Sequence, residues 1–302
     1  MKAKYIILLS LIILTRLSFS QSNGIIIDKT TKKPVPYVNI WIENENYGTT
    51  SNFNGIFELD KSKSIGKTLV FSSVSYKTKK IRYEAVIDTI MLEPDIINIP
   101  EVIISTKKKL ETASLGFLKR KIPAYYIGCN AKPLIIAKKI LFNHNYENTP
   151  FLKSIEFLTQ SNIKNAKFKI RLHSIDENGF IGNRIYSKNI IGIARKGTHK
   201  TKIDISDLDI IVPKEGFFIL IEWLIIDDNK HTFSYIDHDS RKKYHDGISY
   251  EPSFATYVGQ TNEISWIYRS GYWDKDWEHI NSKSKPVPNQ YDIIQTKITL
   301  SN

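Results

Sequence analysis

The sequence predicts an all-β protein made of two β-sandwiches, a small one followed by a larger, jelly-roll-like one. Short runs of alternating apolar and polar residues recur along the chain, and turn-forming residues separate them about every eight to twelve positions. No long run has a convincing helical period, apart from a weak one over residues 110–122. With one cysteine, Cys129, the chain has no internal disulfide, so packed cores must stabilise it.

The N-terminus has the features of a secretory signal peptide. Lys2 and Lys4 precede an apolar run over residues 5–14, and Ser20 is a small residue before a cleavage site. A retained membrane anchor is the alternative, but a bilayer takes about 20 apolar residues and this run is shorter. We therefore expect residues 1–20 to be removed and the mature chain to be exported without a transmembrane segment.

The chain is basic, with a formal net charge of +12, and part of the excess gathers between Ser105 and Asn145. That segment contains nine basic residues against one acidic residue, Glu111: Lys107, Lys108, Lys109, Lys119, Arg120, Lys121, Lys132, Lys138 and Lys139. A basic patch can attract anionic lipid, polysaccharide or nucleic acid. Nucleic acid does not suit an exported chain, and a solvated linker and strand surface is the favoured interpretation.

Residues 21–95 are predicted to form the first sandwich. Its strands are expected at residues 24–28, 38–42, 56–59, 68–72, 81–83 and 89–92. The stretch "GTTSNFNGIFEL" contains Asn54-Gly55, which predicts a tight hairpin turn because both residues tolerate a positive φ. A calcium loop would need acidic oxygens at alternate positions, where this stretch has Asn52 and Asn54. We interpret the stretch as a corner of the fold.

Two segments, "GIIIDKTTKKPVPYVNIWIENENYGTTSNFNGIFELD" and "LVFSSVSYKTKKI", resemble the carboxypeptidase regulatory-like domain, a prealbumin-like (transthyretin-like) β-sandwich. The similarity covers about residues 24–92. The sequence departs from the family pattern at Ser75, where the family has Gly before Tyr76. Matching positions are Gly24, Pro36, Val38, Ile40, Gly48, Thr49, Thr50, Gly55, Phe57 and Tyr76. The resemblance implies an accessory domain without catalytic residues of its own.

Residues 96–114 are expected to be a linker. Within it, "IPEVIIS" resembles a segment that follows regulatory-like domains in exported proteins of Bacteroidota-type envelopes, including TonB-dependent receptors. The rest of the chain is too short for the 22 strands of such transporters, so we reject that function. The resemblance implies a protein of the periplasm or the outer membrane, or one displayed at the cell surface.

Residues 115–302 are predicted to form the second sandwich. Strand patterns occur at residues 134–141, 151–158, 168–173, 189–193, 201–205, 217–226, 254–257, 264–267 and 293–300. The sequence Asp176-Glu177-Asn178-Gly179 predicts a hairpin turn. The segments "KFKIRLHSIDENGFIGNRIYSKNI" and "VPKEGFFILIEWL" resemble an uncharacterised β-sandwich module that follows regulatory-like domains.

The segment "SWIYRSGYWDKDWEHI" is rich in aromatic residues and is the candidate ligand site. Exposed aromatic rings can bind the apolar faces of sugars, and Trp adds one N–H donor. The predicted platform consists of Trp266, Tyr272, Trp273 and Trp277. We expect Trp273 and Trp277 to lie on one face of a loop at the end of the second sandwich, with at least one ring partly exposed, because Gly271 and a polar run interrupt the strand pattern. The alternative is that these rings close the end of the sandwich core.

The sequence predicts no metal, no cofactor and no catalytic residue. The segment "HTFSYIDHDSRKKYHDG" contains the His and Asp side chains that a divalent metal uses, but consecutive residues of a strand point to opposite sides, and we interpret it as a solvated loop. Its candidate ligands are His231, Asp237, His238, Asp239, His245 and Asp246. Glu222, Asp227 and Asp228 are candidates for acid–base chemistry only because carboxylates are common, and no nucleophile motif is present.

These observations predict a non-catalytic exported envelope protein, acting as a binding or structural module. The expected partner is a cell-envelope glycan or another envelope component such as an outer-membrane protein. The alternative is a carbohydrate-active or peptidase-related hydrolase with an accessory regulatory-like domain. A cleft with two convergent carboxylates or a His-metal cluster would favour the hydrolase, whereas exposed aromatic rings would favour the binding module.

Overall fold

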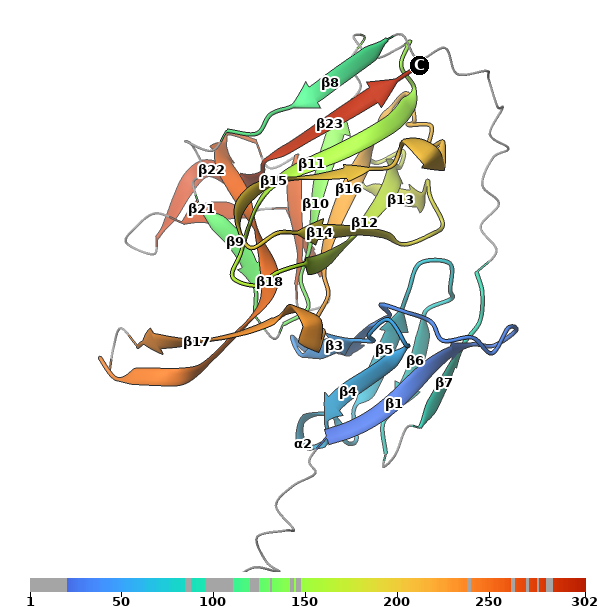
Figure 1. The fold of residues 1–302 in the computed structure, drawn as a ribbon, viewed down its shortest axis with the longest axis vertical. Helices are drawn as coiled ribbons and strands as arrows, with labels where there is room; N and C mark the ends of the chain where they lie inside the picture. The colour runs from blue at the N-terminus through green and yellow to red at the C-terminus, as the bar shows by residue number, and fades with distance from the viewer. Residues whose placement is uncertain are drawn as a thin grey trace, which may run out of the picture.

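The computed structural model describes residues 21–84, 88–95, 111–119, 125–130, 132–141, 144, 148–237, 240–261, 264–269, 272–275, 277–280 and 285–302. The predicted signal peptide and most of the predicted linker, residues 96–110, lie outside the described residues. So do five cations of the basic segment: Lys107, Lys108, Lys109, Arg120 and Lys121. Figure 1 shows the described chain as two all-β bodies that lie against each other, which confirms the predicted fold class. No helix in the described part of the chain is long and apolar enough to cross a membrane.

The first body is a sandwich of two sheets, with strand orders β4-β1-β7 and β3-β2-β5-β6. Its elements are β1 (Gln21–Asp28), β2 (Asn39–Ile42), β3 (Gly48–Thr50), β4 (Ile56–Asp60), α2 (Lys61–Ser64), β5 (Thr68–Ser72), β6 (Lys79–Arg82) and β7 (Thr89–Leu92). Apolar residues at alternate positions of these strands, such as Ile40 and Ile42 of β2, are buried between the sheets. The predicted strands are therefore confirmed, and those at 68–72 and 89–92 have the predicted ends.

The Asn54-Gly55 turn is a corner, but it differs from the predicted hairpin. Only Gly55 has a positive φ, at 73°, and its N–H donates to the carbonyl of Asn52 over 3.0 Å. The side chain of Asn52 also accepts hydrogen bonds from the N–H groups of Asn54 and Ile56. Strands β3 and β4, which flank the corner, belong to different sheets, so the turn carries the chain across the sandwich.

Ser75 occupies the position where the family pattern has glycine. Its φ is +67°, the left-handed region that glycine enters without steric cost. The Ser75 hydroxyl donates a hydrogen bond to the carbonyl of Ser187 in the second body. The residue that departs from the family pattern, Ser75, thus has an unfavourable backbone conformation and also forms a hydrogen bond between the two bodies.

The second body is a larger sandwich of two sheets. One sheet has the order β13-β12-β16-β10-β19-β20, with β14 also paired to β12. The other has the order β21-β22-β18-β11-β23-β8, with β15 on β11 and with β9 and β17 on β18. The strands are β8 (Thr112–Gly116), β9 (Tyr126–Cys129), β10 (Ile135–Leu141), β11 (Phe151–Ser161), β12 (Ala166–Ile175), β13 (Ile181–Arg184), β14 (Ile190–Ala194), β15 (Gly197–Asp204), β16 (Gly216–Trp223), β17 (Lys230–Ile236), β18 (Lys243–Gly259), β19 (Ser265–Arg269), β20 (Tyr272–Asp274), β21 (Glu278–Ile280), β22 (Pro286–Ile294) and β23 (Thr296–Ser301), with the short 3₁₀ turns η2 (Ser206–Leu208) and η3 (Asp227–Asn229).

Aromatic rings dominate the core between these two sheets. Phe254 of β18 packs edge-to-face against Phe157, Phe168 and Trp223, with ring centroids 4.9 to 5.5 Å apart. The apolar residues of β12 and β16 that point inward alternate with residues that point out of the sandwich. The outward face of this sheet therefore has its own set of side chains, and it is the face that meets the first body.

Two predictions about the second half are wrong. Residues 112–116 form strand β8, paired with β23, instead of the weakly predicted helix. The His- and Asp-rich segment is no simple loop, because β17 pairs with the first half of β18 to form a hairpin arm. The arm projects from the second body in Figure 1. The predicted turn at Asp176 to Gly179 is confirmed, since the Gly179 N–H donates to the Asp176 carbonyl and Gly179 has a φ of 79°.

The two bodies are joined by hydrogen bonds and by apolar contacts. The Thr50 N–H donates to the Ile225 carbonyl, and the Ile225 N–H donates to the Thr50 hydroxyl over 3.1 Å. Tyr37 of the first body packs in a buried cluster with Leu224 and Ile226. These contacts fix β2 and β3 of the first sandwich beside the outward face of β12 and β16.

Candidate functional site

A cleft of about 230 Å³ lies where the two sandwiches meet. The first body supplies one wall from β2, β3, β5 and the loop after β2. The second body supplies a floor from five neighbouring strands of one sheet, β12, β16, β10, β19 and β20. Side chains that line the cleft include Asn39, Trp41, Glu45, Asn46, Ser72, Ile135, Arg171, His173, Leu220, Tyr268 and Trp273.

Strand pairing arranges the floor in rows across the sheet. One row runs Lys169, Glu222, Ile135, Tyr268, Trp273, and the next runs Arg171, Leu220, Ala137, Trp266. Four strand spacings separate β12 from β20, a length of about 19 Å. The floor is thus charged at its β12 end, apolar in the middle and aromatic at its β20 end.

The aromatic end is built from paired strands. Tyr268 and Trp273 are directly opposite each other on β19 and β20, with ring centroids 5.3 Å apart. Trp41 of β2 joins them from the first body, because Asn39 and Trp41 alternate with the buried Ile40 and face the cleft. Tyr268 and Trp273 are both half-buried, so part of each ring is open to a ligand.

At the charged end, one carboxylate lies between two cations. The Glu222 side chain is 1% exposed, and its Oε2 lies 3.0 Å from Lys169 Nζ and 2.7 Å from Arg171 Nη2. Lys169 also donates to the Tyr37 carbonyl of the first body over 2.8 Å, and its side chain is fully buried. Burial lowers the pKa of Lys169 to about 8, although the Glu222 charge acts in the opposite direction. Docking of the two bodies therefore buries this cluster.

His173 adds a neutral imidazole next to Arg171 along β12. Burial, together with the charges of Arg171 and Arg184, lowers the pKa of His173 to about 4. The Nδ1 atom lies 2.9 Å from the Gly182 carbonyl, so in the neutral ring Nδ1 carries the proton and Nε2 is an acceptor. His173 Nε2 has no hydrogen-bond partner among the described residues.

The four predicted platform residues do not form one surface. Trp273 is half-buried and lines the cleft, and Tyr272 is 58% exposed on the same short strand. Trp266 is 3% exposed and packs against Phe218. Trp277 is 8% exposed and belongs to the core between the sheets. The prediction that Trp273 and Trp277 share a face is wrong, because Trp277 points into the sandwich whereas Trp273 lies on the outward face of the sheet. Trp273 also lies in strand β20, not in a loop.

Sequence reasoning missed Trp41, Arg171 and His173 as lining residues. A signal for two of them was present, since Lys169, Arg171 and His173 occupy alternate positions of "FKIRLH" and must share a strand face. No comparable signal pointed to Trp41, which enters the site through the docking of the two bodies.

The candidate acid–base residues and Cys129 lie in surroundings that explain them structurally. Glu222 is held between Lys169 and Arg171, and Asp228 is paired with Lys167 over 2.7 Å. Burial raises the pKa of the Cys129 thiol to about 12, in agreement with a small buried apolar residue. Within the described ranges, no group of three or more His, Cys, Asp and Glu side chains is placed to hold a metal ion, and His238 and Asp239 lie outside those ranges.

The basic segment is not one surface either. Lys138 is 7% exposed and donates to the Ile294 carbonyl inside the second body, whereas Lys139 extends over the Phe218 ring on the outward face. The interpretation of this segment as a solvated surface is wrong for Lys138, because successive residues of β10 point to opposite sides of the sheet.

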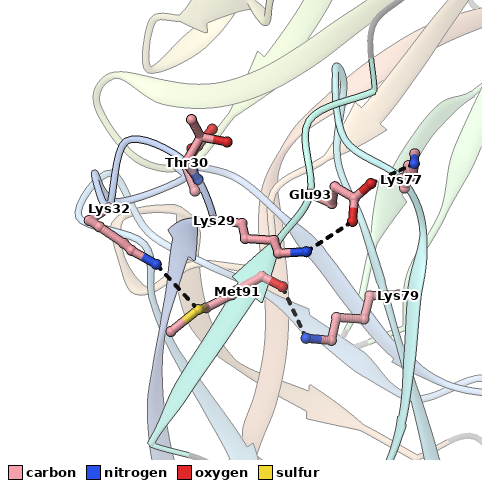
Figure 2. Close-up of polar contacts among 8 residues, drawn as sticks. Lys29, Thr30, Lys32, Lys77, Lys79, Met91 and Glu93 are labelled. Carbon is pink, nitrogen blue, oxygen red and sulfur yellow. Dashed lines mark hydrogen bonds and ion pairs between the residues drawn. The ribbon is translucent and has the colours of Figure 1, made fainter.

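A group of lysines surrounds Glu93 and Met91 on the first body (Figure 2). Glu93 pairs with Lys77 over 2.5 Å and with Lys29 over 3.3 Å. Lys79 donates to the Met91 carbonyl and Lys32 to the Met91 sulfur. The side chains of both ion pairs are about half exposed, so water and salt screen the attraction.

The hairpin arm has a second group of aromatic rings. His231 stacks on Phe233, and Tyr235 stacks on Tyr244, with ring centroids 6.1 and 5.4 Å apart. Phe233, Tyr235 and Tyr244 are all more than a third exposed. The arm is therefore a second exposed aromatic surface, and an experiment on the cleft needs a control variant in the arm.

Residues 22–104 match the CarboxypepD_reg-like domain family, which confirms the predicted resemblance of the first sandwich. No curated protein is significantly similar to the chain. Similar solved structures include the cysteine protease and lectin-like domains of Cwp84, a surface layer associated protein of Clostridium difficile, at 15% identity and a TM-score of 0.37. That similarity covers 65% of this chain and 37% of the other.

Two further similar structures are more distant. The infectious bursal disease virus Gx strain structure is 11% identical with a TM-score of 0.25, covering 93% of this chain and 63% of the other. A putative membrane-associated protein of unknown function from Bacteroides fragilis NCTC 9343 is 12% identical with a TM-score of 0.18, covering 84% and 97%. This chain therefore spans less than two thirds of the Cwp84 and viral chains.

Proposed function

We propose that this protein is a non-catalytic binding module of a cell envelope whose ligand is a glycan. The match of residues 22–104 to the CarboxypepD_reg-like domain family supports a module of this kind, because the resemblance implies an accessory domain. The glycan binds in the cleft between the two sandwiches. The observation that carries the proposal is the convergence of Trp41, Tyr268 and Trp273 from both bodies on one cleft.

The chemistry of the lining supports a sugar ligand. Aromatic rings offer broad apolar faces to the C–H faces of a pyranose, and the half-buried Trp273 and Tyr268 rings keep part of their surface accessible. Asn39, Asn46 and Ser72 line the opposite wall and supply donors and acceptors for hydroxyl groups. Ligand sites commonly combine mainly apolar walls with a few polar groups that fix orientation, often at domain interfaces.

Export to the envelope rests on the sequence. The N-terminal twenty residues have the layout of a signal peptide, and the "IPEVIIS" segment resembles one found in exported envelope proteins. A chain anchored in or carried to the envelope would meet glycans there. The location is tested by fractionating cells that produce the full chain and sequencing the N-terminus, which we expect to be Gln21.

The binding function is tested with a glycan array probed by residues 21–302. We expect binding that Trp273→Ala weakens at least tenfold, or about 1.4 kcal/mol, because the ring supplies a sugar-binding face. Tyr272→Ala is the matched control, since Tyr272 lies on the same strand and outside the cleft lining. Tyr235→Ala controls for the hairpin arm.

Loss of binding in Tyr235→Ala but not in Trp273→Ala would move the site to the arm and overturn the cleft assignment. Release of shorter sugars from a bound glycan would overturn the non-catalytic part of the proposal. In that case Glu45, a carboxylate in the lining that pairs with Lys67 over 2.8 Å, would be the first residue to change.

A further inference from the structure

The β12 end of the cleft has more positive than negative charge. Lys169 and Arg171 of β12 and Arg184 of β13 lie near the buried carboxylate Glu222, and the charge of Asp95 of the first body acts on Arg184. Glu222 and Asp95 carry two negative charges, so they cannot neutralise all three cations. A ligand anion at this end would supply the missing negative charge.

Arg171 is the cation that faces the cleft. Its side chain is 10% exposed, and its hydrogen bond to Glu222 uses only Nη2, with a donor–acceptor distance of 2.9 Å. Its Nε has no hydrogen-bond partner in the part of the chain that the structure describes. Glu222 thus holds the guanidinium in place while leaving some of its five N–H donors unused.

The pKa values of the neighbouring bases point to the same excess. After burial, the charge of Arg171 is among the causes that lower the pKa of Lys169, His173 and Arg184. All three groups would hold their protons more strongly if an anion lay against Arg171. This agrees with the geometry, in which Arg171 lies between Lys169 and His173 on one strand face.

We propose that the cleft selects an oligosaccharide that contains a carboxylated sugar, a hexuronic acid, with the carboxylate facing Arg171. This inference rests on the proposed function and adds the class of sugar. Arg is suited to the carboxylate because its planar guanidinium pairs with two oxygens at once.

The remaining groups place the rest of the ligand. The β12 and β20 ends are about 19 Å apart, longer than one sugar ring, so the carboxylated unit at Arg171 and the unit stacked on Trp273 belong to different sugars of one chain. Leu220 and Ile135 form the apolar floor between them.

The experiment is titration calorimetry of residues 21–302 with two matched tetrasaccharides, one of β-1,4-linked glucuronic acid and one of β-1,4-linked glucose. They differ only in the group at C6. We expect the acidic tetrasaccharide to bind at least tenfold more tightly in 0.1 M salt. This preference should shrink in 1 M salt, where the Debye length falls from about 10 Å to about 3 Å.

Arg171→Met tests the residue, and Arg241→Met, in the exposed turn of the hairpin arm, is the matched control. We expect the preference to disappear in the first variant and to persist in the second. If Arg171→Met fails to fold, Arg171→Lys is the deciding variant, because it keeps the positive charge beside Glu222 but lacks the planar guanidinium. We expect its preference for the acidic tetrasaccharide to fall by at least half.

The outcomes separate the two proposals. Equal affinity for both tetrasaccharides, lost in Trp273→Ala, would overturn the selection of acidic sugars while the proposed glycan binding stands. Binding of neither would count against the glycan-binding function itself. A preference for the acidic sugar that is unchanged in Arg171→Met and in 1 M salt would overturn the role given to Arg171.

Discussion

Glu222 and Glu93 each lie between two cations, but in opposite surroundings. Glu222 is 1% exposed and contacts Lys169 and Arg171 at the junction of the two bodies. Glu93 is 48% exposed and contacts Lys29 and Lys77 on the open surface of the first body (Figure 2). The same arrangement of one carboxylate and two cations therefore occurs in a buried cluster at Glu222 and in a solvent-exposed cluster at Glu93.

Burial, not the number of ion pairs, decides how much a charge cluster matters to the stability of the fold. Exposed pairs are screened by water and salt and contribute little. Buried charges cost several kcal/mol to dehydrate, so each must keep its partner. At Glu222 this requirement also fixes Arg171 at the wall of the cleft, which is how the fold prepares the candidate site.

The largest expected effect follows from removing the buried carboxylate. Glu222→Gln leaves Lys169 and Arg171 buried without their counter-charge, so we expect a loss of about 3–5 kcal/mol in the free energy of unfolding. Urea denaturation measures it. A loss below about 1 kcal/mol would show that water reaches this cluster and would break the comparison with Glu93.

Lys138 is a third case, a buried cation that donates to the carbonyl of Ile294 and lies over the Tyr257 ring. Burial lowers its pKa to about 7 from 10.5. The unfolded chain therefore binds this proton more tightly than the folded protein between pH 7 and pH 10.5, and the folded state gains stability as pH rises through that range.

Lys138→Met removes this dependence. We expect the variant to be more stable than the parent protein at pH 7 by at least about 1 kcal/mol, and the difference to shrink toward pH 10. Urea midpoints of both proteins at several pH values measure the trend. A difference that stays constant over this range would mean that Lys138 is solvated in the folded state.

The smallest effect is expected at the exposed cluster. Glu93→Gln removes the partner of Lys29 and Lys77, and the Lys77 hydrogen bond is the main reason that the pKa of Glu93 lies below its ordinary value. Because water replaces the lost contacts, we expect the melting temperature to stay within experimental error at low and high salt. A clear loss of stability at low salt would contradict the contrast with Glu222.

The strand pattern was predictable because it depends on local alternation. Residues 68–72 and 89–92 form strands with the predicted ends, since their inward residues fill the core of one small sandwich. The hairpin arm was not predicted, because β17 is largely exposed and its alternating aromatic residues, Phe233 and Tyr235, do not fill a core.

The candidate site was predictable only in part, because it is made by two bodies. Trp273 could be singled out from the aromatic segment, but the same reasoning grouped it with Trp277, which points into the core. Trp41 lines the cleft from the first body, and the buried Lys169 of the second body donates to the Tyr37 carbonyl of the first. Contacts of this kind join residues far apart in the chain and leave no local pattern.

A ligand held between the two sandwiches must contact both of them. Hydrogen–deuterium exchange of residues 21–302, with and without the glucuronic acid tetrasaccharide, tests it most directly. We expect slower exchange at β2 of the first body together with β12 and β20 of the second, because a ligand in the cleft contacts both walls. Protection confined to a single body, or to the arm formed by β17 and β18, would contradict the account.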